Sequence, residues 1–127
     1  MPATLTEDRF SGAAHYIVSE ANGMYRSREQ VVIASGSGVL KPGTVLGKIT
    51  ASGKYSVYNP AGANGTETAA AILWEGCDAT SEDVRRTATV RDTEVHADVL
   101  AWGAGVTTDQ HKTDALTDLA SSGIIGR

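Results

Sequence analysis

The chain has 127 residues, of which 41% are hydrophobic and 20% are charged, as expected for one ordinary globular domain. Eleven basic residues against fifteen acidic residues give a formal net charge of −4. This balance argues against nucleic acid and against an anionic membrane surface as partners, because both are bound mainly through clustered lysines and arginines.

The first thirty residues are the least regular part of the sequence. Residues 1–15 follow neither a period of two nor a period of 3.6 and hold few large apolar side chains, which is typical of a segment that a partner orders. Residues 16–18 are strand-like, and an Asn-Gly turn signal follows at 22–23. We therefore predict an N-terminal arm over residues 1–30, ordered on binding, and a core domain over residues 31–127. The alternative is that residues 16–30 form an edge strand of the protein's own sheet.

Residues 31–74 predict a series of short β-strands. A strand at VVIASGSG ends in a glycine-serine loop, and Pro42-Gly43 lies between two apolar runs. Proline presets φ at the first corner of a turn and glycine supplies the positive φ at the second, so this pair predicts a type II turn. Tyr55 and Val57 share one face of the next expected strand, and residues 68–74, TAAAILW, predict a buried central strand.

The last third of the chain predicts one long strand and one helix. Over residues 87–102, TATVRDTEVHADVLAW, the alternation of apolar and polar side chains indicates a half-buried strand, with one face made by Val95, Ala97, Val99 and Ala101 and the other by Glu94, His96 and Asp98. In the helix that follows, Thr107 and Gln110 fit a capping box and Gly123 fits a left-handed C-terminal cap. The predicted fold is α+β and β-rich: a small compact β-sheet or barrel-like domain with one C-terminal helix and an extended N-terminal arm.

The residues that most often carry chemistry do not form a recognisable site. The three histidines, His15, His96 and His111, have no metal-site spacing, so surface positions are expected and no metal is predicted. Cys77 is the single cysteine, which excludes an internal disulfide and makes the cytosol the default compartment. No general base is visible for its thiol, so we expect a buried, inert side chain. We predict no catalytic residues, no cofactor and no enzymatic activity.

Lys54 supports a different class of protein. The segment VLKPGTVLGKI, residues 39–49, is similar to a turn of biotinyl and lipoyl carrier domains, in which a lysine on an exposed hairpin is modified. Lys54 in SGKYS is the one candidate for that lysine, but its neighbours do not match the pattern of those domains.

Several stretches taken in order give a stronger resemblance. These are YIVSEANGMYRSREQVVIASG, LKPGTVLGKIT, TAAAILWEGCDAT, RRTATVRDTEVHADVLAW and a closing helix that ends in SSGIIGR. Together they resemble the head decoration proteins of tailed bacteriophages, the family that includes the lambda capsid-stabilising protein, over nearly all of residues 15–127. The apolar strand, the Asp-Val-Leu stretch and the helix of the lambda protein find counterparts in residues 71–73, in residues 98–100 with Trp102, and in residues 109–122.

The resemblance implies a structural role. Such proteins bind as homotrimers at three-fold and quasi-three-fold points of the expanded head and stabilise it against the pressure of packaged DNA. The implied partners are the major capsid protein and further copies of the chain, with no nucleic acid and no membrane. The implied location is the outer capsid surface of the virion, after synthesis in the bacterial cytoplasm. The alternatives are the carrier domain or a trimeric β-domain of a phage tail or adhesin.

The resemblance and the strand-like arm together give candidate binding residues. Those expected to bind the capsid are Tyr16, Ile17, Val18, Met24, Tyr25, Arg26 and Arg28. Trp74 and Trp102 end two predicted strands, and aromatic side chains at such positions serve either as core or as interface anchors. They are the candidates for the trimer interface.

Overall fold

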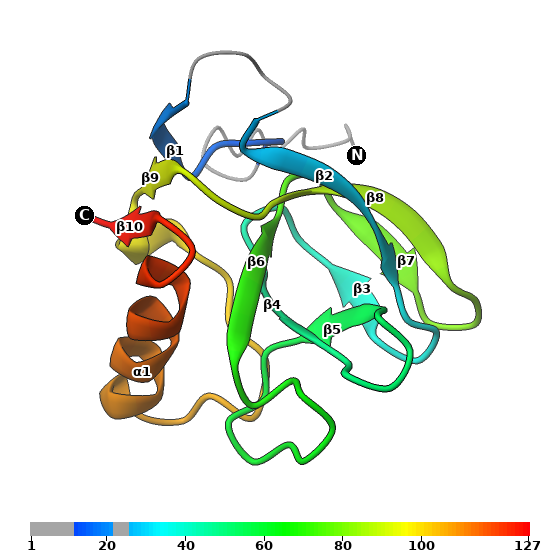
Figure 1. Cartoon of the computed structure of the whole chain (residues 1–127). Coiled ribbons are helices and arrows are strands. Elements are labelled where there is room, and N and C mark those ends of the chain that lie inside the picture. The colour runs from blue at the N-terminus through cyan, green and yellow to red at the C-terminus, as the bar shows by residue number, and fades with distance from the viewer. Residues whose placement is uncertain (1–11, 22–25) are drawn as a thin grey trace, which may run out of the picture.

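The computed structural model describes residues 12–21 and 26–127, and Figure 1 shows their arrangement. In chain order the elements are β1 (Ile17–Glu20), β2 (Arg28–Ile33), β3 (Gly38–Leu40), β4 (Val45–Lys48), β5 (Tyr55–Val57), β6 (Ala69–Leu73), β7 (Cys77–Ala79), β8 (Val84–Thr89), β9 (Thr93–Val95), the 3-10 helix η1 (Ala97–Val99), α1 (Asp109–Ala120) and β10 (Ile124–Gly126). The predicted fold class is confirmed: the molecule is rich in β-structure and has a small barrel and one C-terminal helix. No helix of the described residues is long and apolar enough to cross a membrane.

Five strands close into the barrel in the order β2-β5-β4-β6-β8. β6 lies between β4 and β8 and is buried at four of its five residues, which confirms the predicted central strand. Successive side chains of a strand point to opposite faces, so β6 contributes to two cores. Ala71 and Leu73 face the barrel interior, whereas Ile72 packs toward α1. On β4, Val45 likewise packs in the cluster next to α1, and Leu46 faces the barrel interior.

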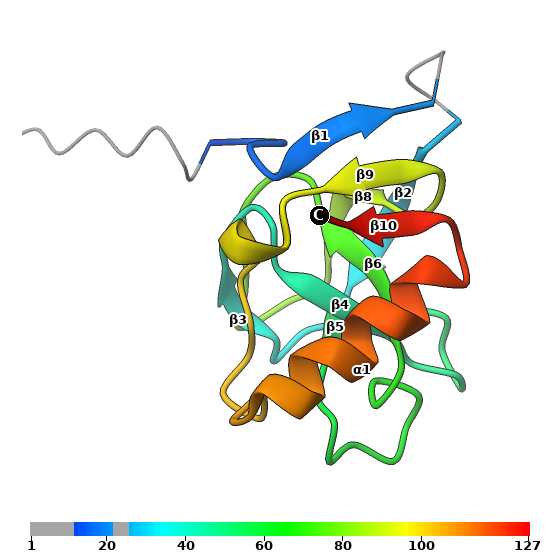
Figure 2. The same cartoon turned by 90° about the vertical axis from the view of Figure 1, so that its left-hand side faces the viewer.

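A second layer covers one side of the barrel. α1 runs along β6, and the three-stranded sheet β1-β9-β10 lies at the end of the helix (Figure 2). β1 is antiparallel to β9, whereas β10 is parallel to it. The core between these layers is continuous, since Leu119 of α1, Ile124 of β10 and Val95 of β9 are all fully buried in one cluster.

The turn chemistry agrees with the predictions. Gly43 has a φ of +85°, and the Thr44 N–H donates to the Lys41 carbonyl at 3.2 Å, as the predicted turn requires. Gly123 has a φ of +81° just beyond the helix, which confirms the left-handed cap. The predicted N-cap of the helix, Thr107, is wrong by one residue. The N-cap is Thr108, whose hydroxyl accepts a hydrogen bond from the His111 N–H at 3.2 Å.

One larger prediction is wrong. Residues 87–102 are not one strand: β8 ends at Thr89, β9 covers only Thr93–Val95, and residues 97–99 form a 3-10 helix that brings Leu100 into the core. The arm boundary at residue 30 stays a prediction, but in the described residues β1 pairs with β9 and β2 begins at Arg28. The edge-strand alternative therefore holds for residues 17–20. Apolar side chains at 16 and 17 have a buried surface of this chain to pack against.

Candidate functional site

β1 forms an open edge of the small sheet. Within the described residues it pairs with β9 alone, through Ile17↔Val95, Ser19↔Glu94 and Glu20↔Thr93, and a register shift lies between Ile17 and Ser19. Because it is the outermost strand, one row of its backbone N–H and C=O groups faces away from the sheet, as a template for a further strand. Val18 is 44% exposed there, so an added strand can cover its side chain. This edge is the best candidate in the structure for a strand-pairing site.

Tyr16 fixes the strand to the body of the protein. Its side chain is fully buried in the core beneath α1, and its hydroxyl lies 2.6 Å from the Thr89 hydroxyl of β8. Burial raises the pKa of the Tyr16 phenol far above its ordinary value, and the hydrogen bond with Thr89 offsets only part of this effect. The Tyr16 side chain therefore anchors β1 from within the fold, and its contact with the capsid stays a prediction.

His15 holds the segment just before β1. Its ring lies near two backbone carbonyl oxygens, with Nδ1 at 2.9 Å from that of Gly12 and Nε2 at 3.4 Å from that of Val99. A Cβ atom on Gly43 would approach the ring to 3.0 Å, so the glycine of the predicted turn also makes room for this histidine. The described chain therefore enters β1 along a fixed path.

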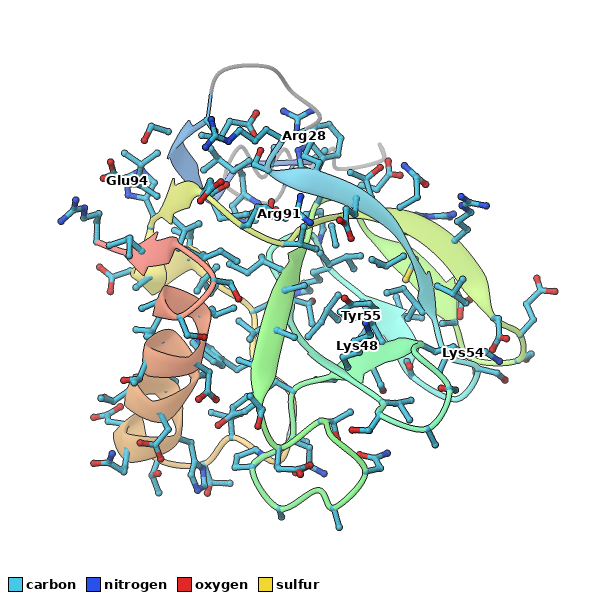
Figure 3. All side chains as sticks on the ribbon, viewed as in Figure 1. Arg28, Lys48, Lys54, Tyr55, Arg91 and Glu94 are labelled. Carbon is cyan, nitrogen blue, oxygen red and sulfur yellow. The ribbon has the colours of Figure 1, made fainter. Side chains whose placement is uncertain are left out.

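Four arginine–carboxylate pairs surround the small sheet and the adjoining end of the barrel. They are Arg26–Asp92, Arg28–Glu20, Arg91–Glu29 and Arg127–Glu94. Figure 3 shows Arg28, Arg91 and Glu94 at this end of the molecule, away from Lys48 and Lys54. Three of the pairs connect segments far apart in sequence, and Arg28–Glu20 connects β2 of the barrel to β1 of the small sheet. A single exposed pair contributes at most about 1 kcal/mol, so their joint effect is to orient the loops around β1 rather than to hold the fold.

Glu20 is the most enclosed of these carboxylates. It accepts hydrogen bonds from the Ser27 hydroxyl at 2.6 Å and from the Arg28 guanidinium. Desolvation raises the pKa of the Glu20 carboxyl, but the hydrogen bonds from Arg28 and Ser27 and the Arg28 charge outweigh it, so the net pKa is lowered. Glu20 is therefore ionised at neutral pH and joins the end of β1 to the start of β2.

Arg28 and Arg26 have different roles. The Arg28 guanidinium carbon lies 5.0 Å from the centre of the Trp74 ring, and its side chain is only 25% exposed, so it is committed to Glu20 and Trp74. Arg26 is 69% exposed, with its Nε 3.4 Å from the Asp92 carboxylate, and remains accessible to a partner. Met24 and Tyr25, the other two predicted capsid contacts, lie outside the described residues.

The two tryptophans have different surroundings. Trp74 is covered on one ring face by Arg28, its carbonyl accepts from the Ala14 N–H at 2.9 Å, and its indole nitrogen is buried without a partner in the part of the chain described here. Trp102 instead lines a surface groove of about 430 Å³ together with Val39 and Val57. Of the two, Trp102 is the one that a second chain can contact without displacing Arg28.

The remaining candidates give no catalytic arrangement within the described residues. Cys77 is buried, and burial raises its thiol pKa. Lys54 lies at the start of β5 with its Nζ 2.6 Å from the Asp83 carboxylate, whereas a carrier lysine must be free for modification. No group of three or more His, Cys, Asp or Glu side chains within residues 12–21 and 26–127 is placed to hold a metal ion.

Sequence reasoning missed several residues of this surface. The acidic partners Glu20, Glu29, Asp92 and Glu94 come from four different segments, and no local pattern pairs them with their arginines. Val39 was also missed, although one apolar residue beside Gly38 in a glycine-rich loop is a weak signal of an exposed position.

Comparison with known families decides between the predicted classes. The family model of the bacteriophage lambda head decoration protein D matches residues 4–124 of the chain. The chain belongs to this family. No curated protein matches the sequence. Membership supports capsid decoration as the function and a structural, non-enzymatic role, in agreement with the resemblance drawn from the sequence.

Proposed function

We propose that this decoration protein binds the outer surface of the expanded phage head as a homotrimer, at three-fold and quasi-three-fold positions, and stabilises the shell against the pressure of packaged DNA. Family membership supports the decoration of a head. The proposed mode of attachment rests on the open edge of β1. This strand begins at Ile17, five residues after the start of the described chain at residue 12.

In the proposed contact, an extended segment of the major capsid protein pairs with β1. Backbone hydrogen bonds to an exposed edge supply affinity, and side-chain pockets supply specificity. Val18 becomes covered by the added strand, and Arg26 meets acidic groups of the shell. Residues 1–11 extend the contact, since eleven extended residues span roughly 36 Å. Tyr16 keeps the strand attached to the barrel, so load on the contact is passed to the core.

Three linked attachments explain how weak contacts give firm binding. If one edge contact has millimolar affinity, about 4 kcal/mol, three joined in one trimer approach nanomolar affinity before linkage losses. Because the residues of β1 are already ordered in the free chain, binding at this strand avoids the entropy cost of ordering them. Each residue that must be ordered on binding costs about 1–2 kcal/mol of backbone entropy.

The test is occupancy on expanded heads that lack the protein, with unexpanded heads alongside. Val18→Lys and deletion of residues 2–11 should each lower head affinity at least about tenfold, because trimeric attachment multiplies a small loss per copy. Val32→Lys is the matched control: Val32 is also exposed, at 36%, but lies on the outer face of β2. The proposal fails if Val18→Lys binds like wild type, or if unexpanded heads bind the protein equally well.

A further inference from the structure

Trp102 lies on the border of two surface hollows. The first, about 430 Å³, is the groove lined by Val39, Lys41, Val57 and the segment 101–104. The second, about 390 Å³, lies between η1 and the start of α1 and contains Asp98, Asp109 and Lys112. Figure 2 shows β3, η1 and the first turn of α1 on one side of the molecule, whereas β1 lies along the top. This side is therefore distinct from the proposed capsid-binding edge.

The groove has the composition of the centre of a protein interface. Val39 is 75% exposed, the most exposed of the large apolar side chains described. Lys41 is the one charged residue among the described residues that line the groove. Two neighbours hold the Trp102 ring in place. The Tyr58 ring packs edge-on against it, with the two ring centres 6.4 Å apart, and the Lys112 ammonium lies 6.0 Å from the centre of the Trp102 ring. A rigid tryptophan beside apolar side chains and few charges is typical of interface hot spots.

The second hollow carries a net negative charge, because its two carboxylates, Asp98 and Asp109, outnumber its one ammonium group, that of Lys112. Asp98 and Asp109 are exposed, and neither forms an ion pair within residues 12–21 and 26–127. Lys41 at the groove is exposed and, over the same residues, also without an ion pair. In a chain with a formal net charge of −4, a contact that brings opposite charges together reduces the repulsion between two copies.

We infer that the occupant of the groove is a second copy of this chain, which presents its Asp98–Asp109 side to Lys41. The inference rests on the proposed trimer and names its contact. A closed ring of three requires a heterologous contact between two different surfaces of each subunit. Those two surfaces meet at the three-fold axis, so the residue on their common border, Trp102, lies next to that axis. Three Val39 side chains and three Trp102 rings then become covered together.

Site-directed cross-linking on heads tests the geometry. Lys41→Cys and Asp109→Cys are combined in a Cys77→Ser chain, bound to expanded heads and treated with a bismaleimide. A ring of heterologous contacts gives covalent trimers as the limiting product under denaturing electrophoresis. Monomers alone, or dimers as the limit, overturn the inference. Each single-cysteine chain is the control and should remain monomeric.

A charge exchange tests the complementarity. Lys41→Glu and Asp109→Lys should each lower head occupancy roughly tenfold, and the double variant should recover to within about threefold of wild type. Thermal unfolding of all three should match wild type, because both positions are exposed. Additive losses in the double variant overturn the inference. If the wild-type chain itself does not bind expanded heads, the proposed function fails; if it binds but neither test succeeds, only this contact fails.

Discussion

The Tyr16 hydroxyl lies 2.6 Å from the Thr89 hydroxyl inside the fold, although 73 residues separate them in the chain. Tyr16 precedes β1 and Thr89 ends β8, so this contact ties the beginning of the described chain to the barrel. β1 is therefore an edge strand that is anchored in the core by a buried side chain.

Removing the anchor should destabilise the whole domain. Tyr16→Ala deletes a fully buried ring and should lower the free energy of unfolding by about 3–5 kcal/mol. Tyr16→Phe keeps the ring and removes only the hydroxyl pair, at a cost of about 1 kcal/mol. Denaturant unfolding measures both. Equal effects of the two variants would show that the hydrogen bond, not the ring, dominates.

Truncation should reveal the boundary of the folded unit. The buried residues of both core clusters lie between positions 16 and 124, so deletion of residues 2–11 should leave the unfolding midpoint unchanged. Deletion of residues 2–21 removes β1 and Tyr16 and should cost at least the roughly 3–5 kcal/mol of the lost ring. Circular dichroism melting compares the two chains. A stable product of the longer deletion would instead support the predicted arm boundary near residue 30.

Glu20 should make stability depend on pH in a defined direction. Its carboxyl pKa is lowered in the folded protein, so its contribution is present above the ordinary value of 4.5 and is lost as pH falls through the lowered value. Glu20→Gln should therefore be less stable than wild type at neutral pH, and the difference should vanish at pH well below 4.5. Denaturation of both chains over this range measures it. A constant difference would assign the effect to packing.

Two glycines with positive φ should respond differently to alanine. Gly53 has a φ of +74° and no atom within 4 Å of the position that a Cβ would take, so Gly53→Ala should cost only the backbone strain, about 1–2 kcal/mol. A Cβ on Gly65 would lie 2.3 Å from the Lys48 carbonyl oxygen. Gly65→Ala should be worse by about 2 kcal/mol or more, because the loop must leave β4. The free energies of unfolding of both variants measure this, and similar losses would mean that the loop moves freely.

Cys77 should be chemically silent in the folded protein. The residue is 8% exposed, and burial raises its thiol pKa, so little thiolate forms at neutral pH. A colourimetric thiol reagent should react only on addition of denaturant, and Cys77→Ser should bind heads like wild type. Rapid labelling of the native chain, or loss of head binding by a folded serine variant, would contradict this.

The sequence by itself determined most of the local structure. Proline and glycine at 42–43 set a turn because their φ preferences are intrinsic. The apolar run of β6 determined a central strand, since such a run must be buried on both faces. The ordered set of motifs also identified the family, which the match over residues 4–124 confirms.

Only the tertiary structure decided where these elements meet. Alternation over residues 87–102 predicted one strand, but the chain breaks between β8 and β9 and bends again after Val95, where Leu100 packs into the core beneath α1. Tyr16 begins one predicted strand and Trp102 ends another, and from the sequence both are equally plausible as exposed binding residues. Tyr16 is buried because β8 supplies a hydroxyl partner and a core, whereas Trp102 lines an open groove because no other described segment covers β3 on that side. Partners distant in sequence decide burial, and no short-range pattern encodes them.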